Sequence, residues 1–404
     1  MHDLPNLTAS AQRLGKPAWR VMLEYVARLH AKSIRPARFP FPYDWEEIGP
    51  GYWLGPAFGR WDIVHAVLDT LPSEPEHAQR HLLNYLATQQ PDGRMPTVIW
   101  MREGQPSWST TTTQPPVWPV ALQAHADHTS SLELIATGLD HLIRQIGWFE
   151  AHRQAEPFGF YYADVVHGGW ESGVDEGIRL PDVQPSPRAC IDATTHVYAL
   201  YEYAARWAET LGQASAGWQK KAGALRAFIQ YELFDDETGF IYDAWSVRDR
   251  PNRSTSYEGM WPVVLGAATA EQAARVIGDH LLSPQRFLAS HPITSVTQED
   301  RHFELRMWRG PAWNSMTYWA ATGCQRYGAL AAASLLLESA LDDSAKQFAQ
   351  TGTIWEFYHP HGGQPTELLR KPHTPFNVPC RDYLGHNPLL AMAALFEETT
   401  PSLS

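Results

Sequence analysis

The stretch richest in side chains capable of acid–base chemistry is GGWESGVDEGIR, at residues 168–179. Glu171, Asp175 and Glu176 follow Trp170 there, among glycines that let a carboxyl group approach a ligand without crowding. A turn carrying solvated acids has the same composition. The stretch is therefore a candidate catalytic loop, in which Trp170 and Glu171 are candidates for substrate contact.

A second carboxylate stands in an apolar setting, in TGTIWEFYHPHGG at residues 351–363. Glu356 lies between two aromatic residues, and such surroundings can desolvate a carboxyl group and shift its basicity. Trp355 and Tyr358, on either side of it, are candidates for contact with the same ligand.

Two histidine pairs have spacings that resemble a metal clip. His359 and His361 flank a proline and have no third ligand nearby in the sequence, so we expect loop or site-lining histidines there. His77 and His81 are four residues apart but lack the H-E-x-x-H pattern, so an exposed helix face is the simpler interpretation. We expect neither a metal nor an organic cofactor.

Two further stretches combine tryptophan with charged side chains at helix entries: GYWLGPAFGRWD, residues 51–62, and MWRGPAWNSMTYW, residues 307–319. A flat ring can stack on a sugar, while a carboxylate accepts its hydroxyl hydrogen bonds. The candidates for sugar contact in the first stretch are Tyr52, Trp53, Trp61 and Asp62, and the second stretch places Trp308, Arg309 and Trp313 together at a helix start. The alternative is structural: Asp62 would cap a helix, and Arg309 would pair with a neighbouring carboxylate.

Helical spacing of apolar residues dominates the chain that must position these loops. The clearest predicted helices cover 17–33, 74–90, 130–150, 190–211, 214–233, 311–327 and 329–350. Weaker ones cover 60–71, 116–127, 258–267, 270–281 and 386–397. Strand patterns are scarce, with possible small hairpins at 158–165 and 239–245.

About twelve helices with long loops after every second one predict an all-α fold, an (α/α)6 toroid of six inner and six outer helices. Paired amphipathic helices bury one face against the next pair, and ring closure leaves one mouth lined by the long loops. No Gly/Ser linker or charged tract divides the chain, so we expect a single catalytic domain over residues 1–404.

Three motifs carry a resemblance to a known family: WESGVD (170–175), WRGPAW (308–313) and WEFYHPHGG (355–363), with weaker support from GRWD (59–62). The chain resembles the (α/α)6 glycoside hydrolases, which include trehalases, family 63 processing α-glucosidases and bacterial mannosylglycerate and glucosylglycerate hydrolases. It is closest in size to the last group. The family often has Asn-Ser after its acid, where this chain has Glu176-Gly177.

The resemblance implies that Asp175 is the general acid and Glu356 the general base of an inverting hydrolase. It also implies that Trp61, Asp62, Trp308, Arg309 and Trp313 line the sugar subsite. The expected substrate is a small α-glucoside or α-mannoside, such as a glycosylglycerate or a disaccharide. Acidic neighbours would raise the pKa of Asp175 and keep it protonated.

Two other function classes fit the same residues. A sugar epimerase or isomerase on the same toroid would use a histidine acid/base pair, for which the candidates are His196, His302, His359 and His386. A non-catalytic carbohydrate-binding protein would use the aromatics alone. Release of reducing sugar distinguishes a hydrolase from both.

Composition limits the partners and the compartment. The 404 residues carry a formal net charge of −12, so neither nucleic acid nor an anionic membrane is an expected partner. Cys190, Cys324 and Cys380 are too few and too scattered for a disulfide framework, and the N-terminus lacks a secretory pattern, so we expect a cytoplasmic protein. The sequence does not indicate an oligomeric state.

Overall fold

Helices dominate the computed structural model, which describes residues 4–180, 183–249 and 251–400. All twelve predicted helices are present. Six form the inner ring: α3 (Asp62–Thr70), α5 (Trp118–Thr129), α8 (Ile191–Thr210), α10 (Trp261–Val264), α12 (Asn314–Arg326) and α14 (Leu389–Thr399). The outer helices are α2 (Arg20–Ser33), α4 (Pro75–Ala87), α6 (Glu133–His152), α9 (Ala216–Glu232), α11 (Ala270–Arg275) with the π-helical η3 (Val276–Leu281), and α13 (Leu330–Thr351).

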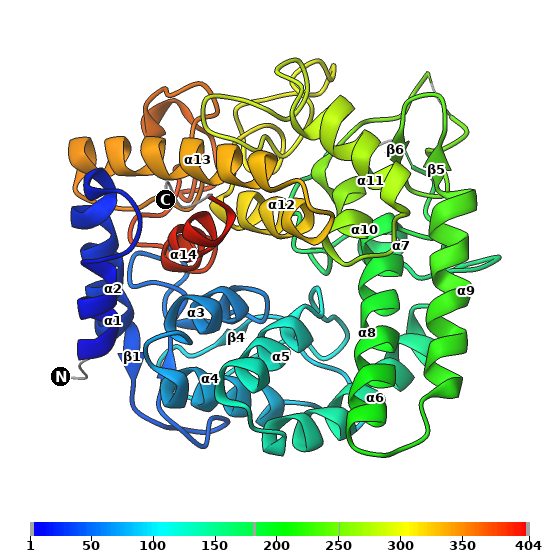
Figure 1. The fold of residues 1–404 in the computed structure, drawn as a ribbon, viewed down its shortest axis with the longest axis horizontal. Coiled ribbons are helices and arrows are strands. Elements are labelled where there is room, and N and C mark those ends of the chain that lie inside the picture. The colour runs from blue at the N-terminus through cyan, green and yellow to red at the C-terminus, as the bar shows by residue number, and fades with distance from the viewer. Residues whose placement is uncertain (1–3, 181–182, 250, 401–404) are drawn as a thin grey trace.

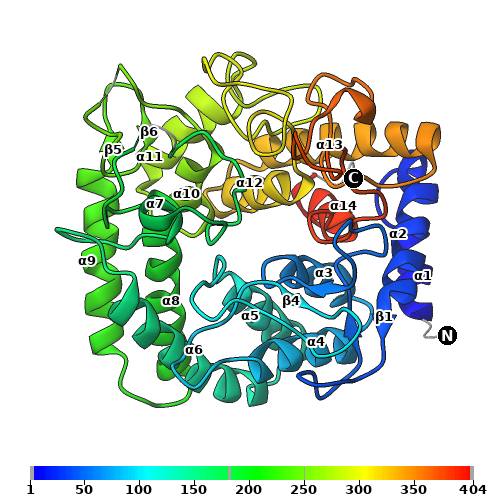
Figure 2. The same ribbon diagram turned by 180° about the vertical axis from the view of Figure 1, so that it is seen from behind.

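The ring closes through its last helix. Each inner helix from α3 to α12, apart from the short α10, packs against the outer helix that follows it in the chain, whereas α14 contacts α2 and α3 near the other end of the chain. Figures 1 and 2 show this ring from opposite sides, with α2 beside α13 and α14 in both views. The expected (α/α)6 toroid is therefore confirmed.

Burial follows the two layers. All nine residues of α3 are buried, and so are most residues of α8, because inner helices are covered on every side. In the outer helix α9, by contrast, only Ala222, Leu225 and Ile229 are buried. None of the helices in the described ranges is both long and apolar enough to cross a membrane.

Short elements complete the chain. Three antiparallel pairs of two-residue strands join β1 (Ile34–Arg35) to β2 (Trp45–Glu46), β3 (Ala57–Phe58) to β4 (Ile99–Trp100), and β5 (Phe234–Asp235) to β6 (Phe240–Ile241). Helices α1 (Pro5–Ala11) and α7 (Asp164–His167) and the 3-10 turns η1 (Pro17–Trp19), η2 (Tyr257–Met260) and η4 (Pro365–Glu367) were not predicted as separate elements.

Two local predictions are corrected. The hairpin expected at 158–165 is absent: Phe160 makes only an isolated bridge, and Asp164 begins α7. The Asp164 carboxylate accepts hydrogen bonds from the N–H groups of Glu171 and Ser172. Pro311 does not start the helix expected at 311–327. The chain stays extended there, since Ala312 bridges to neighbouring segments, and α12 begins at Asn314.

A buried ion cluster anchors the loop that precedes α8. The Arg179 guanidinium lies 2.7 Å from Asp192, 2.8 Å from Asp243 and 2.7 Å from Glu258. These carboxylates belong to α8, to the segment after β6 and to η2, so one cation ties the loop to three elements. Burial raises the pKa of Asp243 to about 7 in spite of the opposing charge of Arg179.

Replacing Arg179 tests this anchor. Arg179→Met leaves three carboxylates buried without their cation, and we expect it to lower the free energy of unfolding by about 3–5 kcal/mol, measured by urea denaturation. The matched control is Arg248→Met, which removes a cation whose side chain is 84% exposed and should cost less than about 1 kcal/mol. Equal losses in both variants would contradict the anchoring role.

Candidate active site

One pocket gathers residues from nearly every candidate stretch. It is a cavity of about 310 Å³, a size typical of a small-ligand site. Its walls come from the loops that precede the inner helices α3, α5, α8, α12 and α14, so it lies on the side of the ring where these helices begin. Its lining residues include Tyr52, Asp62, Trp100, Gln114, Trp170, Asp175, Trp308, Trp313, Glu356, Arg370, Lys371, Tyr383 and His386.

Asp175 projects into the pocket from the loop before α8. Its carboxylate accepts a hydrogen bond from Nζ of Lys371 at 2.9 Å, and its side chain is 20% exposed. Burial raises its pKa, and the charge of Glu356 adds to the rise, while Lys371 and Arg370 oppose it. The predicted direction is thus confirmed, but burial and Glu356 replace the sequence neighbours as the cause.

Glu356 lies in the same pocket with the opposite electrostatic balance. Burial alone would raise its pKa, but the adjacent Arg370 guanidinium and the N–H of Cys380 lower it below its usual value. Arg370 donates from Nε to one carboxylate oxygen at 2.6 Å and from Nη2 to the other at 2.9 Å. Both side chains are only 3% exposed, so the pair keeps a carboxylate ionised in a largely dry place.

The third carboxylate of the pocket belongs to Asp62, the first residue of α3. It accepts a hydrogen bond from the Tyr383 hydroxyl at 2.7 Å, and burial raises its pKa. Gly59 and Gly385 flank its carboxylate so closely that a Cβ added at either would lie 1.9 Å or 2.0 Å from an oxygen. Glycine is therefore required at both positions for the Asp62 side chain to fit into this wall.

Stacked indoles form one side of the pocket. The rings of Trp308 and Trp313 are parallel within 1°, with centroids 3.8 Å apart. Trp61 lies behind them, 6.2 Å from Trp308 between centroids, and His386 packs edge-on against all three rings. The arrangement holds two aromatic residues rigidly at the wall.

Six predicted contact residues do not line this pocket: Trp53, Trp61, Glu171, Arg309, Trp355 and Tyr358. The buried Glu171 carboxylate instead binds Arg153 and the N–H groups of Thr113 and Ala163. Arg309 pairs with Glu304 at 3.1 Å, which is the structural alternative that the sequence left open.

The remaining residues of this group pack behind or beside the wall. Trp53 donates its indole N–H to the Val378 carbonyl, and Trp355 donates to the Thr351 hydroxyl. The Tyr358 hydroxyl accepts from the N–H of Trp355, and its ring stacks on His291.

Sequence reasoning missed several lining residues. Arg370 and Lys371 sit in the predicted loop that also carries Glu356, but no motif marks them, and only the folded loop turns them toward the two carboxylates. Tyr383 likewise has no local pattern. His386 was considered only as an epimerase candidate.

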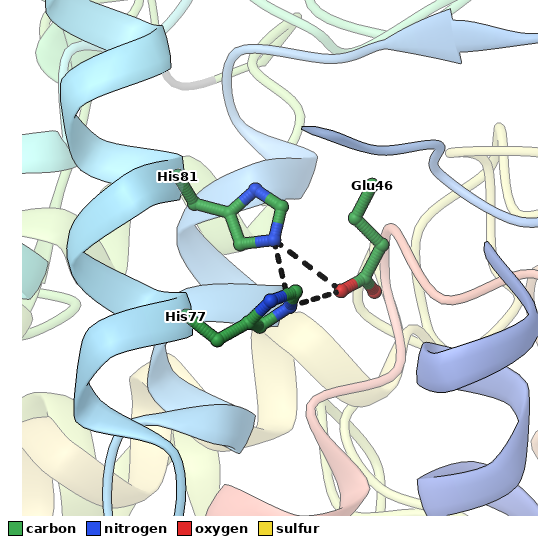
Figure 3. Close-up of side chains that lie close together, drawn as sticks. All are labelled: Glu46, His77 and His81. Atoms are coloured by element: carbon green, nitrogen blue, oxygen red, sulfur yellow. Dashed lines mark hydrogen bonds and ion pairs between the residues drawn. The ribbon is translucent and has the colours of Figure 1, made fainter. Parts of the chain in front are cut away.

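The prediction for His77 and His81 is wrong. Both belong to α4, yet His81 is fully buried and the His77 side chain is only 13% exposed. Their rings face Glu46 of β2 rather than solvent (Figure 3), because the hairpin β1–β2 packs against this helix.

The ring of paired helices thus carries one pocket in which carboxylates, a guanidinium and stacked indoles meet. The model of the mannosylglycerate hydrolase MGH1-like glycoside hydrolase domain family matches residues 56–377. The chain belongs to this family and is a glycoside hydrolase. No curated protein sequence matches it significantly.

Solved structures share the fold at low sequence identity. A GH63 mannosylglycerate hydrolase from Thermus thermophilus in complex with glucose is 20% identical, with a TM-score of 0.69 over 93% of this chain and 99% of that one. The same enzyme in complex with Tris and D-glycerate is 18% identical, with a TM-score of 0.69 over 92% and 98%. Neutral trehalase from Saccharomyces cerevisiae is 16% identical, with a TM-score of 0.69 over 96% and 80%.

The seat of Asp62 generates a stability prediction. Gly385→Ala places a methyl group against a carboxylate that Gly59 confines on the other side, so we expect a loss of about 1–3 kcal/mol of unfolding free energy, measured by thermal and urea denaturation. The same substitution at Gly217, in α9, meets no atom within 4 Å and should stabilise the protein by about 0.4–1 kcal/mol. A Gly385→Ala protein as stable as the wild type would show that Asp62 is free to move.

Proposed function

We propose that the protein hydrolyses a small α-glucoside or α-mannoside with inversion at the anomeric carbon, using Asp175 as general acid and Glu356 as general base. The observation that carries this proposal is the pair of carboxylates in one pocket whose pKa values shift in opposite directions. A raised pKa favours a proton donor, and a lowered pKa favours an ionised acceptor.

In this mechanism Asp175 donates its proton to the glycosidic oxygen as the bond to the anomeric carbon breaks. Glu356 takes a proton from the water that attacks the opposite face of that carbon. The stacked wall of Trp308 and Trp313 would bind the apolar face of the sugar, and Asp62 would accept its hydroxyl hydrogen bonds. Among the described residues, the buried Nη1 of Arg370 has no partner, so it can donate to a sugar hydroxyl.

The size and chemistry of the pocket support a small substrate. A cavity of about 310 Å³ suits a sugar with a compact aglycone better than a long polysaccharide. The related Thermus enzyme is named a mannosylglycerate hydrolase and has been seen with glucose and with D-glycerate. Glycosylglycerates and disaccharides, including trehalose, therefore lead the substrates to screen for reducing-sugar release.

The epimerase alternative receives no support from the histidines. Of the four candidates, only His386 belongs to the lining of this pocket, and burial lowers its pKa to about 3. One neutral, buried imidazole does not supply the acid/base pair that such a reaction needs.

Replacing each carboxylate tests the catalytic pair. Asp175→Asn and Glu356→Gln should each lower kcat by about 100-fold or more, because acid–base catalysis contributes roughly that much. The assay is reducing-sugar release on the best substrate of the screen, with folding checked by circular dichroism.

The control for these variants is Glu176→Gln, next to Asp175 in the chain but exposed and outside the pocket lining. It should retain nearly wild-type kcat. Near-normal turnover by Asp175→Asn or by Glu356→Gln would overturn the assignment of that residue.

The pH dependence of kcat/KM tests the electrostatic balance. Lys371→Met removes a cation that lowers the pKa of Asp175, so this pKa should rise. Only the alkaline limb of the profile should then move to higher pH, because the acid stays protonated to higher pH. Arg370→Met removes the charge that lowers both carboxyl pKa values, so both limbs should move to higher pH. An unchanged acidic limb in Arg370→Met would show that Glu356 is not the base.

A further inference from the structure

Three potential metal ligands converge on the outer side of the ring, away from the pocket. Oε2 of Glu46, in β2, lies 3.1 Å from Nε2 of His77 and 3.5 Å from Nε2 of His81, and the two Nε2 atoms are 2.8 Å apart. Figure 3 shows both rings pointing from α4 toward the same carboxylate oxygen. None of the three residues lines the pocket.

Hydrogen bonding alone does not satisfy this triangle. Each Nε2 either carries a proton or offers a lone pair. If both carry protons, two N–H groups oppose each other at 2.8 Å. If only His77 is protonated there, the lone pair of His81 faces the carboxylate, and if only His81 is protonated, the lone pair of His77 faces it at 3.1 Å. With an ionised Glu46, each of these arrangements leaves at least one repulsive contact.

A divalent cation resolves all three contacts at once. A tetrahedral zinc ion with bonds of about 2.0–2.1 Å requires ligand atoms about 3.3 Å apart, close to the observed separations of 2.8, 3.1 and 3.5 Å. Two imidazole nitrogens and one carboxylate oxygen are a preferred zinc ligand set. The His77 side chain is 13% exposed, so solvent reaches one of the three ligand residues.

The surrounding side chains orient the carboxylate for this role. The other oxygen of Glu46, Oε1, is bound by Nδ1 of His30 at 2.5 Å, and the second nitrogen of His30 contacts Asp69 at 3.1 Å. Glu46 is thus held so that only Oε2 points at the two histidines of α4. Such supporting contacts are typical of metal sites.

A second cluster provides a contrast. Cys190, Asp192 and Asp243 also bring potential ligand atoms within 4.8 Å of one another. There the guanidinium of Arg179 already supplies the cation, through ion pairs to both aspartates. The ion-pair partners of Glu46 in the described part of the chain are instead histidines: His30, His77 and His81.

We propose that Glu46, His77 and His81 form a binding site for a zinc-class divalent cation, which joins β2 to the outer helix α4. The segment that leaves β2 reaches the pocket two residues later, at Ile48. The ion therefore stabilises the position of the segment that runs from β2 to Ile48 in the pocket wall. It takes no part in the proposed hydrolysis.

Calorimetric titration of tag-free, chelator-treated full-length protein with ZnCl₂ tests the site. The wild type should bind one Zn²⁺ saturably, with a rise in melting temperature, and His77→Gln should bind at least about tenfold more weakly because one of three ligands is lost. The control is His128→Gln, the same change at an exposed histidine of α5, which should bind as the wild type does.

The visible absorption spectrum of the wild-type protein loaded with Co²⁺ in place of Zn²⁺ is an independent test that needs no variant. A tetrahedral site with histidine ligands should give an intense visible absorption band that Zn²⁺ displaces. This measurement decides the question even if His77→Gln fails to fold. Absence of saturable Zn²⁺ binding, equal binding by folded His77→Gln, or only the weak spectrum of hydrated Co²⁺ would each overturn the proposal.

Discussion

The bidentate ion pair between Arg370 and Glu356 is the interaction on which the pocket depends. Two charged side chains that are each only 3% exposed are stable together only because both carboxylate oxygens are matched by guanidinium N–H groups, with a further N–H from Cys380. The result is an anion held beside Asp175, whose own surroundings favour the proton. Direct contact with Arg370 thereby keeps Glu356 ionised in a cavity of about 310 Å³ that it shares with Asp175.

The toroid makes this arrangement possible because each pocket wall comes from the segment before a different inner helix. Asp62 stands at the start of α3, and the loops that precede α8, α12 and α14 contribute Asp175, Trp308 and Glu356 respectively. Ring closure by α14 brings the last of these segments back beside the first. The buried cluster around Arg179 performs a similar task for the loop before α8, a few residues beyond Asp175. The loops are irregular, yet buried ion pairs fix their positions.

Sequence periodicity predicted the ring but not the details of its loops. The apolar residues of α8 and α13 recur at helical spacing because one face of each helix is buried. Such spacing involves residues close together in the sequence, so the sequence alone predicts these helices. Asp175 and Glu356 could be proposed from the sequence because each belongs to a local motif. Arg370 and Tyr383 could not be proposed in this way, because no local motif marks them. Arg370 is defined by its contact with Glu356, and Tyr383 by its contact with Asp62, 321 residues earlier in the chain. The environment of the two histidines of α4 was misjudged for the same reason, because Glu46 approaches from a distant hairpin.

The central claim is that Asp175 and Glu356 act on opposite faces of the sugar as acid and base. The stereochemistry of the first product tests it most directly. Proton NMR during the first minutes of hydrolysis of an α-glucoside should show the β-anomer of glucose alone, with the α-anomer appearing later by mutarotation. Initial release of the α-anomer would contradict the account, because it would require a covalent glycosyl-enzyme intermediate instead of direct attack by water.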